Sequence, residues 1–571
     1  MDLQRSLLIG AIAVLSFMLL TEWVAFKDAR TASTTVESPR ILSDESTAAN
    51  SADTEVPAAP AAPVSTADDD LPTAPDMEVS ATTTAREISP EATGRIVQVR
   101  TDTLQLAIDL NGGDIIELAL PQYLEKIDRP DTPFVLLEQN ETRTYIAQSG
   151  LIGPDGIDKE GRAVYTTSAS HFELGDGKDS LTVDLKWHND AGIEITKRFT
   201  LHRGDYVIDV DYLVKNSSET RWQANLFGQI KRDSSSAPSV QSGMGIKPFL
   251  GAAITQPDDR FTKISFDEMA EEPFRKQLPG GWIAMIQHYF LSAWIPNPDQ
   301  THTYSTRVTR SGFNIAGFTS PAMILDPGEG GEVGARFYAG PKDQYRLEEI
   351  SPYLDLSVDY GWLWWIAQPL FWLLTKIHGL VGNWGVAIIL LTVLIKAAFF
   401  KLSATSYKSM AKMRQVQPKM MDIREQYADD KQKQSQAMME LYRKEKINPM
   451  GGCLPILVQM PVFIALYWVL MESVELRHSP FILWIKDLSV MDPYFVLPLL
   501  MGASMWFMQK LNPPPPDPMQ ARIMQWLPIV FTFFFLWFPA GLVLYWVVNN
   551  LLSMAQQYVI TRQIEAASAS T

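Results

Sequence analysis

One lysine, Lys396, lies inside an apolar stretch that runs from residue 386 to residue 400. A charge in the hydrocarbon of a bilayer costs about 2.5–3.5 kcal/mol even on the lowest scales, so a span that keeps a lysine usually offers it water and protein groups. The other interpretation is snorkelling. The polar region that begins at Ser403 is about 10 Å away along a helix, and a lysine stem covers much of that distance. Lys396 therefore indicates either a hydrated groove with a positive charge or a side chain that reaches the membrane surface.

Few other polar side chains interrupt the apolar stretches. They include Thr392, Gln459, Asn549 and Asn550, with Gln556 and Gln557 near the end of the last stretch. Hydrogen bonds between helices are one explanation for such residues. The sharper interpretation is that they line one hydrated cavity together with Lys396.

Several familiar chemistries are absent from the sequence pattern. A transporter driven by carboxylates needs acids or histidines at mid-membrane, whereas Glu22 and Glu472 lie only near the ends of apolar stretches. We find no P-loop, no metal-ligand spacing and no pair of interrupted spans in matching halves. The single cysteine, Cys453, excludes an intrachain disulfide. We therefore expect no catalytic residue, no metal and no cofactor, and a protein that is not an enzyme.

The apolar stretches predict six membrane spans. The first, within residues 1–27, reads as an uncleaved anchor because no small-residue cleavage site follows it, although a cleaved signal peptide is the alternative. The other five spans are predicted at residues 381–402, 453–471, 493–511, 522–538 and 542–560. A shorter tryptophan-rich stretch at residues 361–378 predicts an amphipathic helix in the membrane interface.

The rest of the chain divides by composition. Residues 28–91 are rich in Ala, Ser, Thr, Pro and acids, which predicts a disordered tether. Residues 92–345 alternate apolar and polar side chains, for example at 181–187 and 206–212, which predicts an antiparallel β-sandwich.

Charge sets the predicted orientation. Residues 403–450 lie in a region, 401–450, that holds eleven Lys or Arg against six Asp or Glu, although the whole chain has a net charge of −16. Basic loops stay in the cytoplasm, which places both termini there, including the tail at 561–571, and places residues 28–360 on the other side. Apolar side chains at three- and four-residue steps predict a helical hairpin in this loop. It is either a self-contained coil or a basic platform for anionic headgroups, ribosomal RNA or an incoming apolar segment.

Long motifs in the second half of the chain are specific enough to compare with known families. They are Ser409-Met-Ala-Lys-Met-Arg414, Gln417-Pro-Lys-Met420, Lys446-Ile-Asn-Pro-Met-Gly-Gly-Cys-Leu-Pro455, Gln459-Met-Pro461 and Phe535-Leu-Trp-Phe-Pro-Ala-Gly-Leu-Val-Leu-Tyr545. The chain resembles the YidC membrane protein insertase family over essentially its whole length, in the form with a large periplasmic domain that Gram-negative inner membranes contain.

The resemblance implies a five-helix core around a hydrophilic groove that is open to the cytoplasm and the lipid and closed toward the periplasm. The central basic residue of that groove matches Lys396. The family often has arginine there, and lysine keeps the charge without the bidentate fork. The resemblance also implies a hydrophobic slide on the third and fifth spans. Its matching positions are Leu457, Met460, Ile464, Val530, Phe534 and Phe538, for which ordinary packing or lipid contact is the alternative explanation.

The resemblance therefore implies a membrane protein insertase and membrane chaperone of the bacterial cell inner membrane that hydrolyses no nucleotide. Its expected partners are nascent membrane-protein clients, the ribosome, the Sec translocon and the lipid bilayer. A small-solute transporter or channel is the first alternative. A membrane-anchored, carbohydrate-binding or mutarotase-like enzyme is the second, although the β domain shows no paired carboxylates with a histidine base.

Overall fold

The computed structural model describes residues 70–72, 95–235, 248–428, 430–445, 454–511 and 518–569. The predicted anchor at residues 1–27, most of the tether at 28–91 and Cys453 lie outside the described residues.

The alternating segments form two sheets. From edge to edge, the ten-stranded sheet consists of β14 (Arg275–Pro279), β17 (Thr301–Val308), β18 (Asn314–Leu325), β11 (Trp222–Arg232), β5 (Thr144–Ile152), β4 (Pro133–Gln139), β3 (Asp114–Leu124), β2 (Gln105–Asp109), β1 (Ile96–Arg100) and β7 (His171–Glu173). The nine-stranded sheet consists of β13 (Thr262–Ser265), β12 (Gly251–Ile254), β15 (Ile283–Ile286), β16 (Phe290–Pro296), β19 (Gly330–Pro341), β10 (Val207–Asn216), β9 (Ile193–His202), β8 (Ser180–His188) and β6 (Thr166–Thr167).

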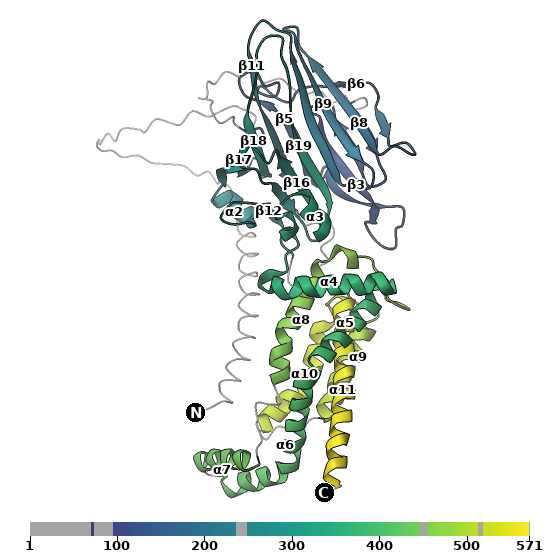
Figure 1. The fold of residues 1–571 in the computed structure, drawn as a ribbon, viewed down its shortest axis with the longest axis vertical. Coiled ribbons are helices and arrows are strands. Elements are labelled where there is room, and N and C mark those ends of the chain that lie inside the picture. Colours follow the sequence, from purple (N-terminus) through teal and green to yellow (C-terminus); the bar gives the residue numbers. More distant parts are fainter. Residues whose placement is uncertain are drawn as a thin grey trace, which may run out of the picture. The chain divides into compact units, whose positions relative to one another are not determined.

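The two sheets pack face to face as a β-sandwich (Figure 1). Trp294 of β16 reaches across to β11, where its indole Nε1 donates to the carbonyl oxygen of Gln229 at 3.1 Å. Gly228 makes this approach possible, because a Cβ there would lie 2.8 Å from the Trp294 ring. The prediction of a β-sandwich is therefore confirmed. The prediction that its strands are all antiparallel is wrong at one edge of the ten-stranded sheet, where β7 pairs in parallel with β1. The short β7 is reached after β6 has paired in the other sheet, so the chain meets β1 while crossing between layers.

The helices follow the β domain. Two short helices, α2 (Phe266–Glu271) and α3 (Gln344–Ile350), lie within and just after the sheets, and the 3₁₀ turns η1 (Leu354–Ser357) and η2 (Gly361–Leu363) lead out of them. The long helices are α4 (Trp364–Val381), α5 (Trp384–Ala398), α6 (Phe400–Gln426), α7 (Lys431–Lys444), α8 (Leu454–Glu472), α9 (Val496–Leu511), α10 (Pro518–Phe535) and α11 (Ala540–Ala569), with the turn η4 (Val474–Leu476) after α8.

Helix α4 runs across the direction of α5, α8 and α11 (Figure 1). It begins after η2 and ends at Gly382, whose φ of 67° suits a residue without a side chain. Its exposed tryptophans include Trp364, Trp365 and Trp372. Helices α6 and α7 pack as a hairpin through Val416, Met420 and Leu441.

The predicted span at residues 381–402 differs from the structure, in which the helix breaks at Phe399. There the backbone N–H of Phe399 bonds to the carbonyl of Ile395 and closes α5, and α6 starts at a bend of 66°. Within the part of the chain that the structure describes, no unbroken helix is both long and apolar enough to cross a membrane. The bent pair Trp384–Ala398 and Phe400–Met413 meets that test together, and Leu457–Glu472 and Ala521–Phe535 are shorter apolar helices.

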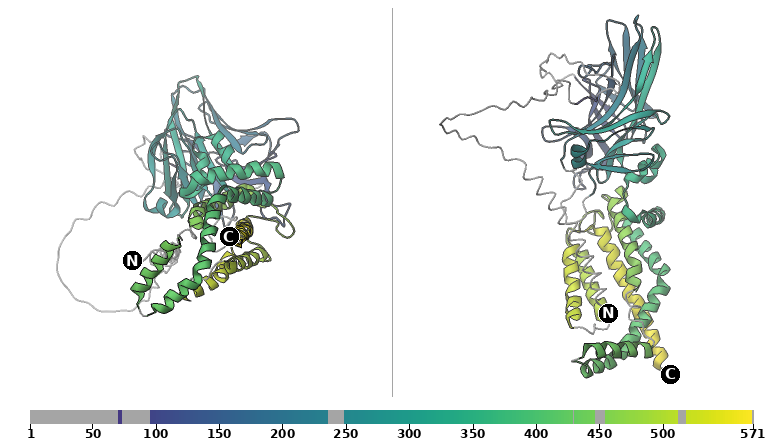
Figure 2. Two further views of the ribbon diagram at one scale, coloured as in Figure 1. Left: turned by 60° about the horizontal axis from the view of Figure 1, so that its bottom comes forward. Right: turned by 90° about the vertical axis from the view of Figure 1, so that its left-hand side faces the viewer.

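Helices α9 and α10 run side by side (Figure 2), and a glycine lies at their contact. A Cβ on Gly502 would lie 1.9 Å from the hydroxyl oxygen of Thr532. Small residues allow helices to approach closely in membrane proteins. We expect Gly502→Ala to lower the thermal unfolding midpoint, at a cost of about 1–3 kcal/mol for overpacking. Gly379→Ala is the matched control, since a Cβ on this helical glycine meets nothing within 4 Å. Equal midpoints for the two variants would contradict the close contact.

Candidate functional site

Lys396 lies in the last turn of α5, where α5, α6 and α11 meet. The half-buried lysine donates from Nζ to Ser553 Oγ at 2.7 Å, and Ser553 in turn donates to the carbonyl oxygen of Asn549 at 2.7 Å. The hydroxyl of Tyr407 on α6 also bonds to Ser553. The bend after α5 brings α6 to this place, and Gln556 of α11 bonds to the carbonyl of Phe400 at 3.4 Å.

The charge of Lys396 is not balanced by an acid in this part of the fold. An ammonium offers three N–H donors. Among the described residues, Ser553 is its hydrogen-bond acceptor and no carboxylate forms an ion pair with it. The arrangement can therefore accept an anionic or strongly polar group, because two of the three N–H donors have no acceptor among the described residues.

The other predicted groove residues differ in their surroundings and hydrogen-bond partners. Thr392 is fully buried and donates to the carbonyl of Ile388 in its own helix at 2.6 Å. Asn550 is buried and donates to Ser504 of α9 at 2.9 Å. The Asn550 bond fits the explanation by hydrogen bonds between helices, whereas the Thr392 bond stays within α5. Gln459 of α8 has a buried Nε2 without a hydrogen-bond partner among the described residues.

The structure thus joins Lys396 to the backbone of Asn549 through a residue that sequence reasoning missed. Ser553 lies four positions after Asn549, one helical turn further along the same face of α11. This four-residue spacing is the sequence signal that could have identified Ser553. Tyr407 was also missed, because it lies in the stretch predicted as a cytoplasmic hairpin.

The predicted slide residues lie on α8, on α10 and at the turn that follows α10. Leu457, Met460 and Val530 are exposed, at 52%, 40% and 59%, whereas Ile464, Phe534 and Phe538 are half-buried. Helix α8 approaches the second of these stripes at one end. Tyr467 of α8 lies 6.1 Å from the Phe538 ring, and Phe538 lies 4.9 Å from the Phe534 ring, both between centroids.

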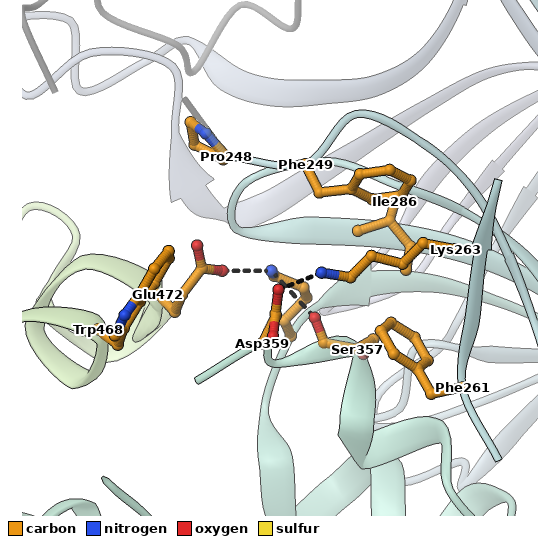
Figure 3. Close-up of a pocket in the computed structure, with 10 residues that line it drawn as sticks. Pro248, Phe249, Phe261, Lys263, Ile286, Ser357, Asp359, Trp468 and Glu472 are labelled. Carbon is orange, nitrogen blue, oxygen red and sulfur yellow. Dashed lines mark hydrogen bonds and ion pairs between the residues drawn. The ribbon is translucent and has the colours of Figure 1, made fainter. Parts of the chain in front are cut away.

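A second feature joins the β domain to α8. Lys342 Nζ donates to Glu472 Oε2 at 2.7 Å, and the two side chains are only 3% and 5% exposed. This pair lines a cavity of about 260 Å³ together with a second ion pair, Lys263 with Asp359, and the ring of Trp468 (Figure 3). Burial of both partners makes this contact costly to break.

Further polar contacts surround this junction. His288 Nε2 donates to the carbonyl of Met471 at 2.9 Å, and burial lowers the pKa of His288 to about 3, so the imidazole is neutral. Arg477 donates to the carbonyl of Leu124 in β3 at 2.6 Å. Hydrogen bonds from several elements therefore hold the β domain against the end of α8 and the turn that follows it.

Glu475 in η4 gives this junction a pH dependence. Burial raises its pKa to about 7, with Asp343 acting in the same direction, and its buried Oε2 has no hydrogen-bond partner among the described residues. Because the folded pKa is above that of an unfolded glutamate, this group's stabilising contribution is complete below about pH 4.3 and is lost as pH rises through 7.

We expect Glu475→Gln to be more stable than the parent protein at pH 8, by up to about 3 kcal/mol, and this difference to shrink to about 1 kcal/mol at pH 5. Thermal unfolding midpoints of both proteins in the same detergent, measured from pH 5 to 8, check this. A constant difference across that range would show that the carboxyl does not titrate there.

The fold defines a protein with a β-sandwich domain and a helical C-terminal region, and comparison with known proteins agrees. The YidC periplasmic domain matches residues 96–373, and the 60Kd inner membrane protein family matches residues 376–567. Proteins called membrane protein insertase YidC from Stutzerimonas stutzeri and Cellvibrio japonicus are each 53% identical over 100% of both chains, and that from Pseudomonas aeruginosa strain PAO1 is 50% identical over the same share. The chain therefore belongs to the YidC membrane protein insertase family.

Solved structures give more distant likenesses. An active YidC insertase with its first transmembrane domain resolved is 18% identical over 82% of this chain and 92% of its own, with a TM-score of 0.36. A galactose mutarotase related enzyme from Lactobacillus acidophilus is 11% identical over 43% of this chain and 97% of its own, with a TM-score of 0.30. Both scores are too low to support a statement about this chain.

Proposed function

We propose that this chain inserts membrane proteins into the bacterial inner membrane, and that Lys396 receives the polar or acidic tail of the client. Membership of the insertase family supports the activity. The observation that supports the role of Lys396 is its ammonium at the junction of three helices, with a serine as its acceptor and no acid beside it among the described residues. A client carboxylate could supply the missing partner.

The membrane topology belongs to this proposal. Six spans, with both termini in the cytoplasm and residues 28–360 in the periplasm, fit the large apolar surface of the helices. Leu499 and Phe507 on α9 and Trp526 and Phe533 on α10 are 58–60% exposed. Large exposed apolar patches mark surfaces that another apolar phase covers, and here that phase is the acyl chains of lipid.

The proposed path begins at the α6–α7 hairpin. Its exposed Met421 and Met439 offer adaptable contacts to an emerging apolar segment. The polar tail of the client then enters beside Lys396, while its apolar helix passes the slide residues on α8 and α10. Burial of about 20 apolar residues in lipid drives this step, so no nucleotide is hydrolysed. The ribosome and the Sec translocon are proposed partners that deliver or receive such clients.

Reconstitution tests the proposed function directly. The purified full-length chain in liposomes is expected to insert a single-span client with an acidic N-terminal tail, scored by protease protection of that tail. Empty liposomes are the control. Flux of small solutes without client insertion would favour the transporter alternative instead.

We expect deletion of residues 28–340 to leave insertion within about threefold of the full-length protein, because the proposed groove and slide lie entirely on helices that follow the β domain. This deletion keeps Lys342, so the residue that pairs with Glu472 is still present. The same protease-protection assay measures it. Complete loss of insertion, in a variant that still reaches the membrane, would relocate the activity to the β domain.

A further inference from the structure

A short segment of the predicted tether, residues 70–72, lies on the ten-stranded sheet. The carbonyl oxygen of Asp70 accepts from Gln229 Nε2 at 2.6 Å and from Arg307 Nη2 at 2.9 Å. The carboxylate of Asp70 pairs with Lys231, the neighbour of Gln229 on the same face of β11. Leu71 packs against Ile152 and Phe227. Asp70 thus accepts from Gln229, Arg307 and Lys231, and Leu71 covers an apolar patch.

These contacts lie on the sheet face that is turned away from the sandwich core. Along β11, Phe227, Gln229 and Lys231 alternate with Gly228, which meets Trp294 of the second sheet, and with Ile230, which belongs to the main core. Phe227 and Ile152 form an apolar cluster of their own. The segment therefore occupies the outer face of this sheet and does not fill the interior of the sandwich.

The polar groups that receive Asp70 are held in place by one another. Gln229 is only 1% exposed, and its amide nitrogen also donates to Gln148 Oε1 at 2.9 Å. Gln148 in turn donates to Asp114 at 2.8 Å, and Arg307 donates to Gln229 Oε1 at 3.0 Å. This buried chain of hydrogen bonds fixes the orientation of the Gln229 amide. The donors of Gln229 and Arg307 are therefore already directed at the position of the Asp70 carbonyl before a peptide binds.

The charged part of the site is also positioned by packing. Lys231 Nζ lies 4.5 Å from the centre of the Phe313 ring, and its side chain is 12% exposed. A cation held over an aromatic face has few alternative conformations and keeps its charge available. Lys231 and Arg307 together make the site positive, whereas the sequence around position 70, Ala67-Asp-Asp-Asp-Leu-Pro72, is acidic.

We propose that this face of the β domain is a binding site for acidic peptide segments with the pattern Asp-Leu, and that the chain's own tether is its resident occupant. An aspartate carboxylate meets Lys231, its carbonyl meets Gln229 and Arg307, and the following leucine meets Ile152 and Phe227. The tether is thereby fixed to the β domain at position 70. A free segment of the same pattern competes with it for this site.

Disulfide formation in the full-length chain tests the proposal. In a Cys453→Ser background, Leu71→Cys and Ile152→Cys are introduced together, and the rate of loss of free thiols under mild oxidation is followed by a maleimide gel shift in lipid nanodiscs. Rapid cross-linking within one chain is expected. A mixture of the two singly substituted proteins shows whether cross-links form between chains. If cross-links form only between chains and not within one chain, the tether is not the resident occupant.

Charge variants and a competitor make the test specific. We expect Lys231→Glu and Asp70→Ala each to slow cross-linking by at least about tenfold, as loss of a hydrogen-bonded charge pair does, and Asp70→Lys with Lys231→Asp to restore part of the rate. Lys215→Glu, on the exposed part of β10, is the matched control. A synthetic peptide of residues 66–74 is expected to slow cross-linking and a scrambled peptide is not. Equal rates in Asp70→Ala, Lys231→Glu and the control, with unchanged thermal midpoints, would overturn the site.

Discussion

Replacing Lys396 with glutamate is expected to reduce insertion of a client with an acidic tail by about tenfold or more. Opposite charges about 4 Å apart near a protein surface attract by about 4 kcal/mol, and the substitution turns that attraction into repulsion. Lys396→Ala should give an intermediate rate, since it removes the attraction without adding repulsion. Protease protection of the client tail in liposomes measures all three proteins under identical conditions.

Three controls separate charge from damage to the fold. Lys396→Arg keeps the charge and should insert at a rate close to that of the parent protein. Lys401→Glu places the same new charge on an exposed residue five positions later and should have little effect. Ser553→Ala removes the hydrogen-bond acceptor of Lys396 and should leave the charge requirement intact. Insertion by Lys396→Glu at the parent rate would show that the ammonium has no role.

Breaking the Lys342–Glu472 ion pair should cause the largest loss of stability. Removal of one partner from a buried pair typically costs about 3–5 kcal/mol, because the remaining charge is left in a poorly solvated place. We therefore expect Lys342→Ala and Glu472→Ala each to lower the thermal unfolding midpoint strongly. Fluorescence-detected unfolding of the full-length protein in detergent provides the measurement.

The double variant Lys342→Met with Glu472→Met tests the cause. Replacing a buried pair by apolar side chains of similar volume is often close to neutral, so this variant should recover most of the lost stability. Lys215→Ala, in an exposed pair with Glu194, is expected to change stability by less than about 1 kcal/mol. Single and double variants of equal stability would mean that packing, and not the unpaired charge, determines the effect.

The sequence predicts those parts of the fold that depend on a local pattern. Residues 206–212 alternate because one face of β10 is buried, and the structure places Val210, Tyr212 and Val214 in the core. The turn between the last two helices is also local: Pro539, which lacks a backbone N–H, lies between the end of α10 at Phe535 and the start of α11 at Ala540. Both features can be read from neighbouring residues alone.

The features that the sequence did not reveal depend on distant partners. Glu472 lies 130 positions from Lys342, and nothing near either residue indicates their contact. The bend at Phe399 falls in the short apolar run 397–400, which contains neither glycine nor proline to indicate a break. It brings α6 toward α11, where Phe400 accepts from Gln556. The attachment of Asp70 was hidden because composition indicates only that a segment lacks a core of its own.

Thiol labelling at position 396 tests the central claim that water reaches this residue from the cytoplasmic side. In a Cys453→Ser background, Lys396→Cys is exposed to a charged, membrane-impermeant reagent in membranes of known orientation, with Lys401→Cys as the exposed reference. We expect cytoplasmic reagent to label position 396 at a measurable fraction of the reference rate and periplasmic reagent to leave it unmodified. Full labelling of position 401 with none at position 396 from the cytoplasmic side would contradict a hydrated groove.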